Sequence, residues 1–320
     1  MHVKNLTHPS GLQILMYHRV LAQPDPFREG DPTVRDFARQ MQVVRRWFQP
    51  LDLVEAAERL QAGTLPPRAC VITFDDGYLD NLTLAAPILK SLGIPATVFV
   101  ASGFGDGRNM WNDVLIDAIL TGQRRPLELM HFGLGRYPCP DPKLGFVSLR
   151  PLLNALKPLP PDTRESAVAD CAAQLVAAPA ARLMLGEEEI RSLQQAGVRI
   201  GAHTVSHPIL NVLDDAAAKA EILESKRTLE SVTGGPIEVF AYPNGRPQVD
   251  YGPRDVELVA NAGFVCAVST RAALALAQDS PYELPRYGLW SHHPARFGLQ
   301  LTRRFLAEGQ AAMPARAQAA

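Results

Sequence analysis

A short apolar run rich in strand-forming residues recurs along this chain, and a helical stretch usually separates one run from the next. Strands that alternate with helices are typical of parallel βα units, arranged either in a barrel or in a doubly wound sheet. The sequence therefore predicts an α/β fold. The expected strands are residues 14–17, 70–74, 96–100, 198–202, 237–241 and 264–268.

The helical stretches between these runs carry their own start and stop signals. Two predicted helices end at Gly93 and Gly197, and glycine favours the left-handed conformation that closes a helix. A third, over residues 214–235, begins at Asp214 or Asp215 as N-cap and has an apolar stripe, so we expect it to pack against the outside of the sheet. The stripe comprises Ala218, Ile222, Leu229 and Val232, with an interruption at Ser225.

Residues 103 to about 185 break the alternation, because turn-rich segments and Ala-rich helical segments occur there without an obvious strand. We interpret them as a helical insertion in one barrel domain that covers residues 1–307. The insertion is either a packed cap over apolar surface or a wall of a substrate cleft. The Ala-rich end, residues 308–320, is expected to be disordered.

The composition excludes several classes of protein. Lys and Arg total 32 against 33 Asp and Glu, which leaves no basic field for nucleic acid. The four cysteines lack CxxC spacing, so we expect them to be reduced and mostly buried. The start of the chain lacks a secretory signal, and no apolar run could span a membrane, so the expected location is cytoplasmic. The sequence does not predict the oligomeric state.

Two adjacent carboxylates, Asp75 and Asp76, follow the predicted strand 70–74 and precede Gly77. Barrels of this class gather their catalytic groups at that end of the strands. Adjacent ionised carboxylates repel each other and lose solvation there, unless a cation or hydrogen bonds compensate. A metal ion would meet this need. The alternative is that Asp-Gly only marks a turn.

Two histidines, His203 and His207, lie just beyond the predicted strand 198–202. Imidazoles four residues apart are a familiar ligand pair, and a carboxylate from elsewhere would complete a three-ligand site with a fourth position for water. Taken alone, a pair at this spacing is more often solvated or structural. Together with the aspartate pair at a second strand end, it favours a metal site, and the ligand types favour zinc.

The motifs TFDDG, HTVSHP and FAYPNG each end a predicted strand, and in this order the sequence resembles the polysaccharide deacetylase family with the NodB homology domain. The similarity extends over residues 14–286. It implies a distorted (β/α) barrel of about seven strands. It also implies a hydrolase that removes an N-acetyl group from an N-acetylated polysaccharide, oligosaccharide or saccharide intermediate.

By this resemblance, Asp75 is the general base, and Asp76, His203 and His207 bind the metal. The metal implied is Zn²⁺, with Co²⁺ or Ni²⁺ as alternatives. The backbone N–H of Asn244, in the turn after the strand 237–241, is the expected oxyanion donor. The candidate substrate contacts are Tyr242, Pro243, His18 and Trp111. His18 is equally well explained as a core histidine, and Trp111 as a packing residue.

The sequence departs from the family at two motifs. Ala241 stands where the third motif usually has an arginine that holds the base, and Asn244 stands where a tyrosine would lie. Arg286 replaces the histidine that serves as general acid in the last motif. Arginine is a poor proton donor, so our hypothesis is that Arg286 holds Asp75 and that Asp75 carries the proton in both steps. A histidine of the segment 291–297, His292 or His293, is the alternative acid.

Two other functions stay open at the level of sequence. A metal-dependent amidohydrolase of the same fold would act on a non-sugar C–N bond. A catalytically silent relative would only bind carbohydrate, although retention of both aspartates and both histidines weighs against it.

Overall fold

The structure is a computed structural model that describes residues 11–178, 181–288, 291 and 293–311. Within these residues, eight strands form the main sheet, and seven of them follow one path in the order β10-β1-β3-β4-β7-β8-β9 while β2 pairs with β3. All of these pairs are parallel. The strands are β1 (Gln13–Tyr17), β2 (Gln49–Pro50), β3 (Ala69–Phe74), β4 (Ala96–Val100), β7 (Arg199–Ala202), β8 (Val239–Ala241), β9 (Cys266–Val268) and β10 (Tyr287–Gly288).

The sheet curls so that its last strand returns to its first. β10 pairs with β1, and a parallel bridge between Val268 and Leu284 brings the chain that leads into β10 beside β9. Parallel strands with intervening helices confirm the expected distorted (β/α) barrel, and the six predicted strands correspond to β1, β3, β4, β7, β8 and β9. The sequence analysis missed β2 and β10, which contain only two residues each.

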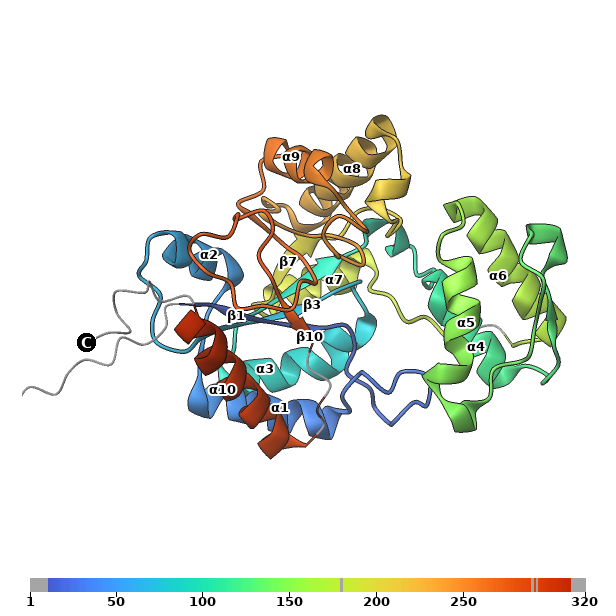
Figure 1. Ribbon diagram of the computed structural model, residues 1–320, viewed down its shortest axis with the longest axis horizontal. Coiled ribbons are helices and arrows are strands. Elements are labelled where there is room, and N and C mark those ends of the chain that lie inside the picture. Colours follow the sequence, from blue (N-terminus) through green and yellow to red (C-terminus); the bar gives the residue numbers. More distant parts are fainter. Residues whose placement is uncertain (1–10, 179–180, 289–290, 292, 312–320) are drawn as a thin grey trace, which may run out of the picture.

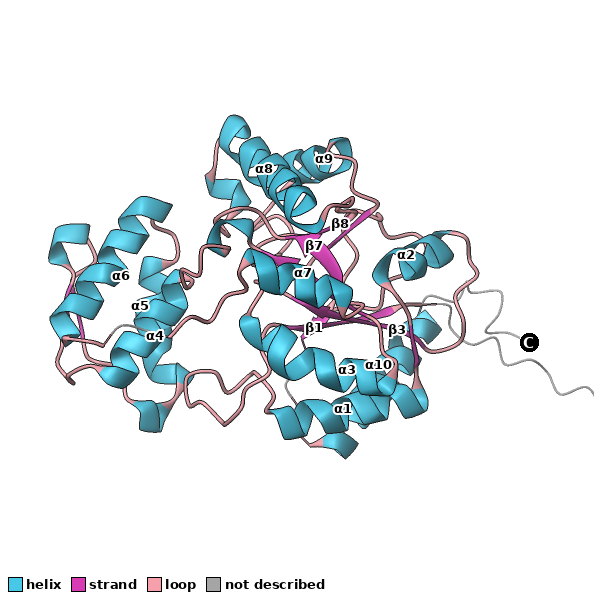
Figure 2. Ribbon diagram, turned by 180° about the vertical axis from the view of Figure 1, so that it is seen from behind, coloured by secondary structure: helices cyan, strands magenta, loops and turns pink. Residues whose placement is uncertain are grey.

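Helices cover the outer face of the sheet, with α8 and α9 on one side and α1, α3 and α10 on the other (Figures 1 and 2). The stripe predicted for α8 is buried, and Ser225 is buried with it, where its hydroxyl is satisfied because it donates to the carbonyl of Ile222. Asp214 is the N-cap of α8, and its side chain accepts from the N–H of Ala217. The helices outside the insertion are α1 (Val34–Trp47), α2 (Leu53–Gln61), α3 (Ala86–Leu92), α7 (Glu187–Gln195), α8 (Asp215–Thr233), α9 (Pro253–Asn261) and α10 (Pro294–Ala311).

Strand β3 shows how the sheet positions Asp75. All six of its residues are buried, as expected for a strand covered on both faces. Ile72 and Phe74 pack among residues of the helix-covered face, while Val71 belongs to the inner apolar cluster. Because side chains alternate along a strand, Thr73 shares the inner face with Val71, and this alternation, continued one step past the strand, brings Asp75 to that face too.

The insertion forms a lobe of its own beside the sheet (Figures 1 and 2). Its helices are α4 (Trp111–Thr121), α5 (Phe146–Leu156) and α6 (Pro161–Leu175), and an antiparallel pair, β5 (Leu127–Glu128) with β6 (Arg136–Tyr137), was not predicted. A separate apolar cluster that includes Leu115, Leu149 and Cys171 fills the lobe. The division of the chain into a barrel, an insertion and a tail stays a prediction, since α10 runs to Ala311 and residues 312–320 lie outside the described part.

Short helical turns connect these elements: η1 (Asn81–Ala85), η2 (Ser102–Phe104), η3 (Met130–Phe132), η4 (Pro142–Leu144) and η5 (Leu210–Val212). The four cysteines are free, three of them buried and Cys139 half-buried, which agrees with the expectation of reduced thiols. In the part of the chain that the structure describes, no helix combines the length and the apolar character needed to cross a membrane.

Candidate metal centre

The turn after β3 carries both aspartates. The N–H of Asp75 donates to the carbonyl of Tyr17 at 2.9 Å, which continues the pairing with β1 by one residue. Asp76 then adopts φ 74°, a left-handed conformation that costs a residue with a side chain about 1–3 kcal/mol. Gly77 follows at φ 87°, and a Cβ there would lie 3.0 Å from Val100 Cγ1. This strained, close-packed turn points to a functional role for the carboxylates.

Asp76, His203 and His207 come together from two strand ends. Asp76 Oδ1 lies 3.5 Å from His203 Nε2 and 3.4 Å from His207 Nε2, and one donor atom from each of the three residues lies within 4.8 Å of the others. Asp76 Oδ1 is buried and has no hydrogen-bond partner among the described residues. A buried carboxylate oxygen without a hydrogen-bond donor is unfavourable unless it binds a cation or another group.

This arrangement fits a divalent ion. Donor atoms held tetrahedrally about 2.0–2.2 Å from zinc lie about 3.3–3.6 Å from one another, a range that includes the two separations between Asp76 and the imidazole nitrogens. Burial lowers the pKa of His207 to about 4, although Asp76 opposes this shift, so the imidazole is neutral at pH 7 and its lone pair is available. Burial alone would raise the pKa of Asp76, but the two histidines lower it overall and keep the carboxylate ionised.

His203 is fixed from both sides. Its backbone N–H donates to the carbonyl of Val100 at 3.1 Å, and its Nδ1 lies 2.7 Å from the carbonyl oxygen of Ala241. Because a carbonyl only accepts, Nδ1 carries the proton and Nε2 directs its lone pair toward Asp76. Ala241, which stands where relatives carry an arginine, thus contributes through its backbone.

Asp75 is held by Arg286. The guanidinium donates from Nη1 and Nη2 to the two carboxylate oxygens at 2.7 Å each, and it also donates to the carbonyl of Ser269 and the hydroxyl of Thr73. Both side chains are buried, with 0% of Arg286 and 3% of Asp75 exposed. Burial would raise the pKa of Asp75, but Arg286 lowers it overall. The geometry matches the proposed anchor, and its catalytic role stays a prediction.

His18 follows β1, is half-buried, and lies close enough to both aspartates for their charges to act on its ring. Burial lowers its pKa, but the carboxylates of Asp76 and Asp75, with a further one from Asp31, raise it overall. Its carbonyl accepts a hydrogen bond from Asn81 Nδ2 at 2.9 Å, which ties this residue to the segment that follows the aspartates. The role of His18 as a substrate contact stays a prediction.

The turn after β8 presents its backbone rather than its tyrosine. The side chain of Tyr242 is fully buried, stacks on Tyr251 at 3.8 Å and donates from its hydroxyl to the carbonyl of Tyr282. Pro243 is also buried. Asn244 is half-buried with φ 58°, and within the described residues no hydrogen bond uses its N–H. The oxyanion role of this N–H stays a prediction, whereas the structure does not present the Tyr242 ring to a substrate.

Two other predicted residues lie elsewhere. Trp111 is the first residue of α4, packs against the core of the insertion and has Arg164 Cζ 5.1 Å from its ring centroid. Its described contacts belong to the insertion, which agrees with the packing interpretation. His293 is exposed before α10, and His292 lies outside the described residues.

The loop after Asp76 is joined to both ends of the insertion. Tyr78 forms an antiparallel bridge with Met184, and the N–H of Leu185 donates to the carbonyl of Gly77 at 2.9 Å. At the other end, the hydroxyl of Tyr78 donates to Asp113 Oδ2 in α4 at 2.7 Å. The insertion is thus anchored directly beside the aspartate pair, a contact that the sequence analysis did not predict.

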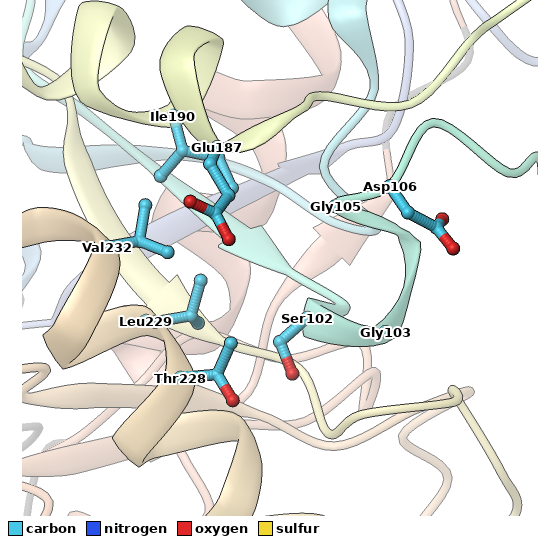
Figure 3. Close-up of a pocket in the computed structure, with 9 residues that line it drawn as sticks. All are labelled: Ser102, Gly103, Gly105, Asp106, Glu187, Ile190, Thr228, Leu229 and Val232. Carbon is cyan, nitrogen blue, oxygen red and sulfur yellow. The ribbon is translucent and has the colours of Figure 1, made fainter.

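A separate pocket lies between η2, α7 and α8 (Figure 3). Ser102, Glu187 and Thr228 contribute polar atoms, and Ile190, Leu229 and Val232 contribute apolar surface. It shares no lining residue with the Asp76 cluster.

Comparisons with known proteins agree with this description. The family model for Polysaccharide deacetylase matches residues 62–266. The protein YxkH of Bacillus subtilis (strain 168), whose name assigns it provisionally to the polysaccharide deacetylases, is 22% identical over 284 residues. The match covers 87% of this chain and 71% of that protein.

Solved structures share the fold at low identity. The deacetylase PplD of Streptococcus pyogenes, solved in complex with acetate, has a TM-score of 0.61 at 20% identity, with 93% of this chain and 99% of that chain covered. IcaB from Ammonifex degensii has a TM-score of 0.58 at 20% identity, with coverage of 91% and 96%.

Proposed function

The chain belongs to the polysaccharide deacetylase family, and we propose that it is a metal-dependent hydrolase that removes an N-acetyl group from an N-acetylated saccharide. Family membership supports deacetylation of sugars. The observation that carries the metal dependence is the buried, unpartnered Asp76 Oδ1, which lies 3.4–3.5 Å from two imidazole nitrogens. Among the described residues, no donor satisfies this oxygen.

Asp76, His203 and His207 would hold the ion, and zinc suits this donor set. When bound, such an ion lowers the pKa of a water molecule and polarises a carbonyl group. Asp75 accepts the proton of the attacking water, and Arg286 keeps that carboxylate ionised and oriented. The N–H of Asn244 donates to the developing oxyanion. Water and the amide are consumed, and acetate and the free amine are released.

The leaving nitrogen needs a proton, and two residues could supply it. Asp75 could return the proton that it took from water, as the sequence analysis proposed, but Arg286 lowers its pKa and makes the protonated form less accessible. His18 is the second candidate, because the carboxylates beside it raise its pKa and so favour the protonated ring. Replacement of His18 by Gln separates the two: loss of turnover with intact metal content assigns the proton to His18.

A deacetylation screen tests the proposal. The chelated protein is incubated with defined N-acetylated saccharides, and with small cyclic amides as the non-sugar alternative, after addition of Zn²⁺, Co²⁺ or Ni²⁺. We expect acetate release from a saccharide only when metal is restored, and none from an Asp76→Ala variant. Equal acetate release from the chelated protein would exclude metal dependence, and turnover of the cyclic amides alone would exclude a saccharide substrate.

A further inference from the structure

Glu221 of α8 binds the loop that joins the two histidines. Its Oε2 accepts from the backbone N–H of Val205 at 2.7 Å and of Ser206 at 2.9 Å, and its Oε1 accepts from the hydroxyl of Ser206 at 2.6 Å. One half-buried carboxylate therefore takes three hydrogen bonds from two consecutive residues. Neither the sequence motif nor the metal cluster includes Glu221.

The loop has a conformation that needs such support. Thr204 and His207 have φ 64° and 56°, in the left-handed region that residues with side chains rarely adopt. On its other side, the N–H groups of Ser102 and Gly103 donate to the carbonyls of Thr204 and Val205. Val205 is thus fixed through both its N–H and its carbonyl, between η2 and Glu221.

The two histidines differ in how they are held. His203 directly follows β7 and is fixed by Val100 and by the Ala241 carbonyl. His207 lies beyond the loop, and its described backbone bond is to Thr204 Oγ1, within the same loop. The position of His207 Nε2 relative to Asp76 therefore depends on the path of residues 204–206.

We propose that Glu221 is a positioning residue that holds His207 in place for the ion, an inference that rests on the proposed metal site. A glutamine could still accept both N–H bonds through its one carbonyl oxygen and could donate to the Ser206 hydroxyl, whereas a methionine of similar length offers no oxygen to any of the three donors. Glu221→Met therefore removes all three hydrogen bonds with little change in volume. Partners of this kind, outside the ligands themselves, typically change metal affinity about 10- to 100-fold when replaced.

The test compares the unmodified protein with three variants. Glu221→Met removes the carboxylate, Ser206→Ala removes one of its three bonds, and Glu224→Met changes an exposed glutamate on the same helix as a control. Zinc dissociation constants are measured by competition with a chromogenic chelator, well below the melting temperature of each metal-free variant. Co²⁺ absorption spectra report the ligand set.

We expect Glu221→Met to raise the zinc dissociation constant about 10- to 100-fold and to alter the Co²⁺ spectrum, with a smaller effect for Ser206→Ala. Glu224→Met should match the unmodified protein. If Glu221→Met binds zinc as tightly as the control and gives the same Co²⁺ spectrum, the positioning role is wrong while the metal site stands. If the unmodified protein binds no zinc, the proposed function itself fails, and this inference fails with it.

Discussion

Arg286 and Asp75 are 211 residues apart in the sequence, yet the guanidinium meets the carboxylate side by side through two hydrogen bonds of 2.7 Å. This bidentate geometry fixes the orientation of the carboxylate as well as its charge. The pair lies inside the curled sheet, since Asp75 continues the inner face of β3 and Arg286 precedes β10. By the family resemblance, the arginine that holds the base would stand at position 241, at the end of β8. In this chain Arg286, just before β10, makes that contact instead.

Replacement of Arg286 tests this anchor. Arg286→Lys keeps a positive charge but loses the two parallel hydrogen bonds of the guanidinium. We therefore expect turnover to fall about 10- to 100-fold with unchanged zinc content. Arg286→Ala leaves Asp75 buried without its partner, so we also expect the free energy of unfolding to fall by about 3–5 kcal/mol. Turnover, zinc content and urea unfolding are measured on each variant. Unchanged activity in Arg286→Ala would remove the residue from the site.

Replacement of Asp75 and replacement of Asp76 should have different effects on zinc content. Asp75→Asn retains the proposed ligands and loses the base, so we expect turnover to fall about 10²- to 10⁴-fold while one zinc per chain remains. Asp76→Asn weakens the ion's only carboxylate ligand, so we expect both zinc and turnover to be lost. Metal analysis and acetate release on the two variants decide this. Loss of zinc from Asp75→Asn alone would reverse the assigned roles.

Asp31 provides a test by pH. Burial raises its pKa to about 6, although His18 and Arg19 oppose this shift. Between about pH 4, the pKa of an unfolded aspartate, and pH 6, the folded protein binds more protons than the unfolded chain, so the contribution of Asp31 to stability falls as pH rises. Above pH 6 that loss is complete, and the ionised side chain then destabilises the folded state.

We therefore expect Asp31→Asn to raise the free energy of unfolding at pH 7.5 by about 1–2 kcal/mol, a value reduced for the partial exposure of the side chain. The gain should shrink toward zero at pH 4. Urea unfolding of the chelated proteins at pH 4, 5, 6 and 7.5 measures it. A difference that is the same at every pH would show that the titration of Asp31 does not contribute.

The anchor of the insertion predicts a smaller change. Tyr78→Phe removes the hydroxyl that donates to Asp113 Oδ2, and Arg28 pairs with the other oxygen, Oδ1. Because Oδ2 then lacks this donor in a buried carboxylate, we expect a loss of about 1–3 kcal/mol in the free energy of unfolding. Urea unfolding measures it, with Tyr137→Phe in the insertion hairpin as a control. A loss as large as that of a broken buried ion pair would mean that Tyr78 holds the lobe in place.

The sequence predicted the strands and the ends at which the site forms, because short apolar runs and glycine stops are local signals. It missed β2, β10 and the β5–β6 pair, since two-residue strands leave no periodicity to detect. It also predicted a substrate contact for Tyr242 without seeing that Tyr251 would stack on its ring and bury it.

Contacts that support the site were the least predictable part. The acceptor for His203 is a backbone carbonyl, at Ala241, and any residue there would provide it. Glu221 is one of several glutamates on an ordinary amphipathic helix, and only the packing of α8 against the histidine loop distinguishes it. The pairing of Arg286 with Asp75 was predicted because arginine is a poor proton donor. An arginine at the position of the family's general acid therefore suggested that its charge binds the base instead.

The most direct test of the account is the position of zinc in a crystal, located by anomalous scattering at the zinc edge. We predict one strong peak bonded to Asp76 Oδ1, His203 Nε2 and His207 Nε2 at about 2.0–2.2 Å from each. A zinc-soaked crystal with no peak among these three atoms, or with its peak on other residues, would contradict the account.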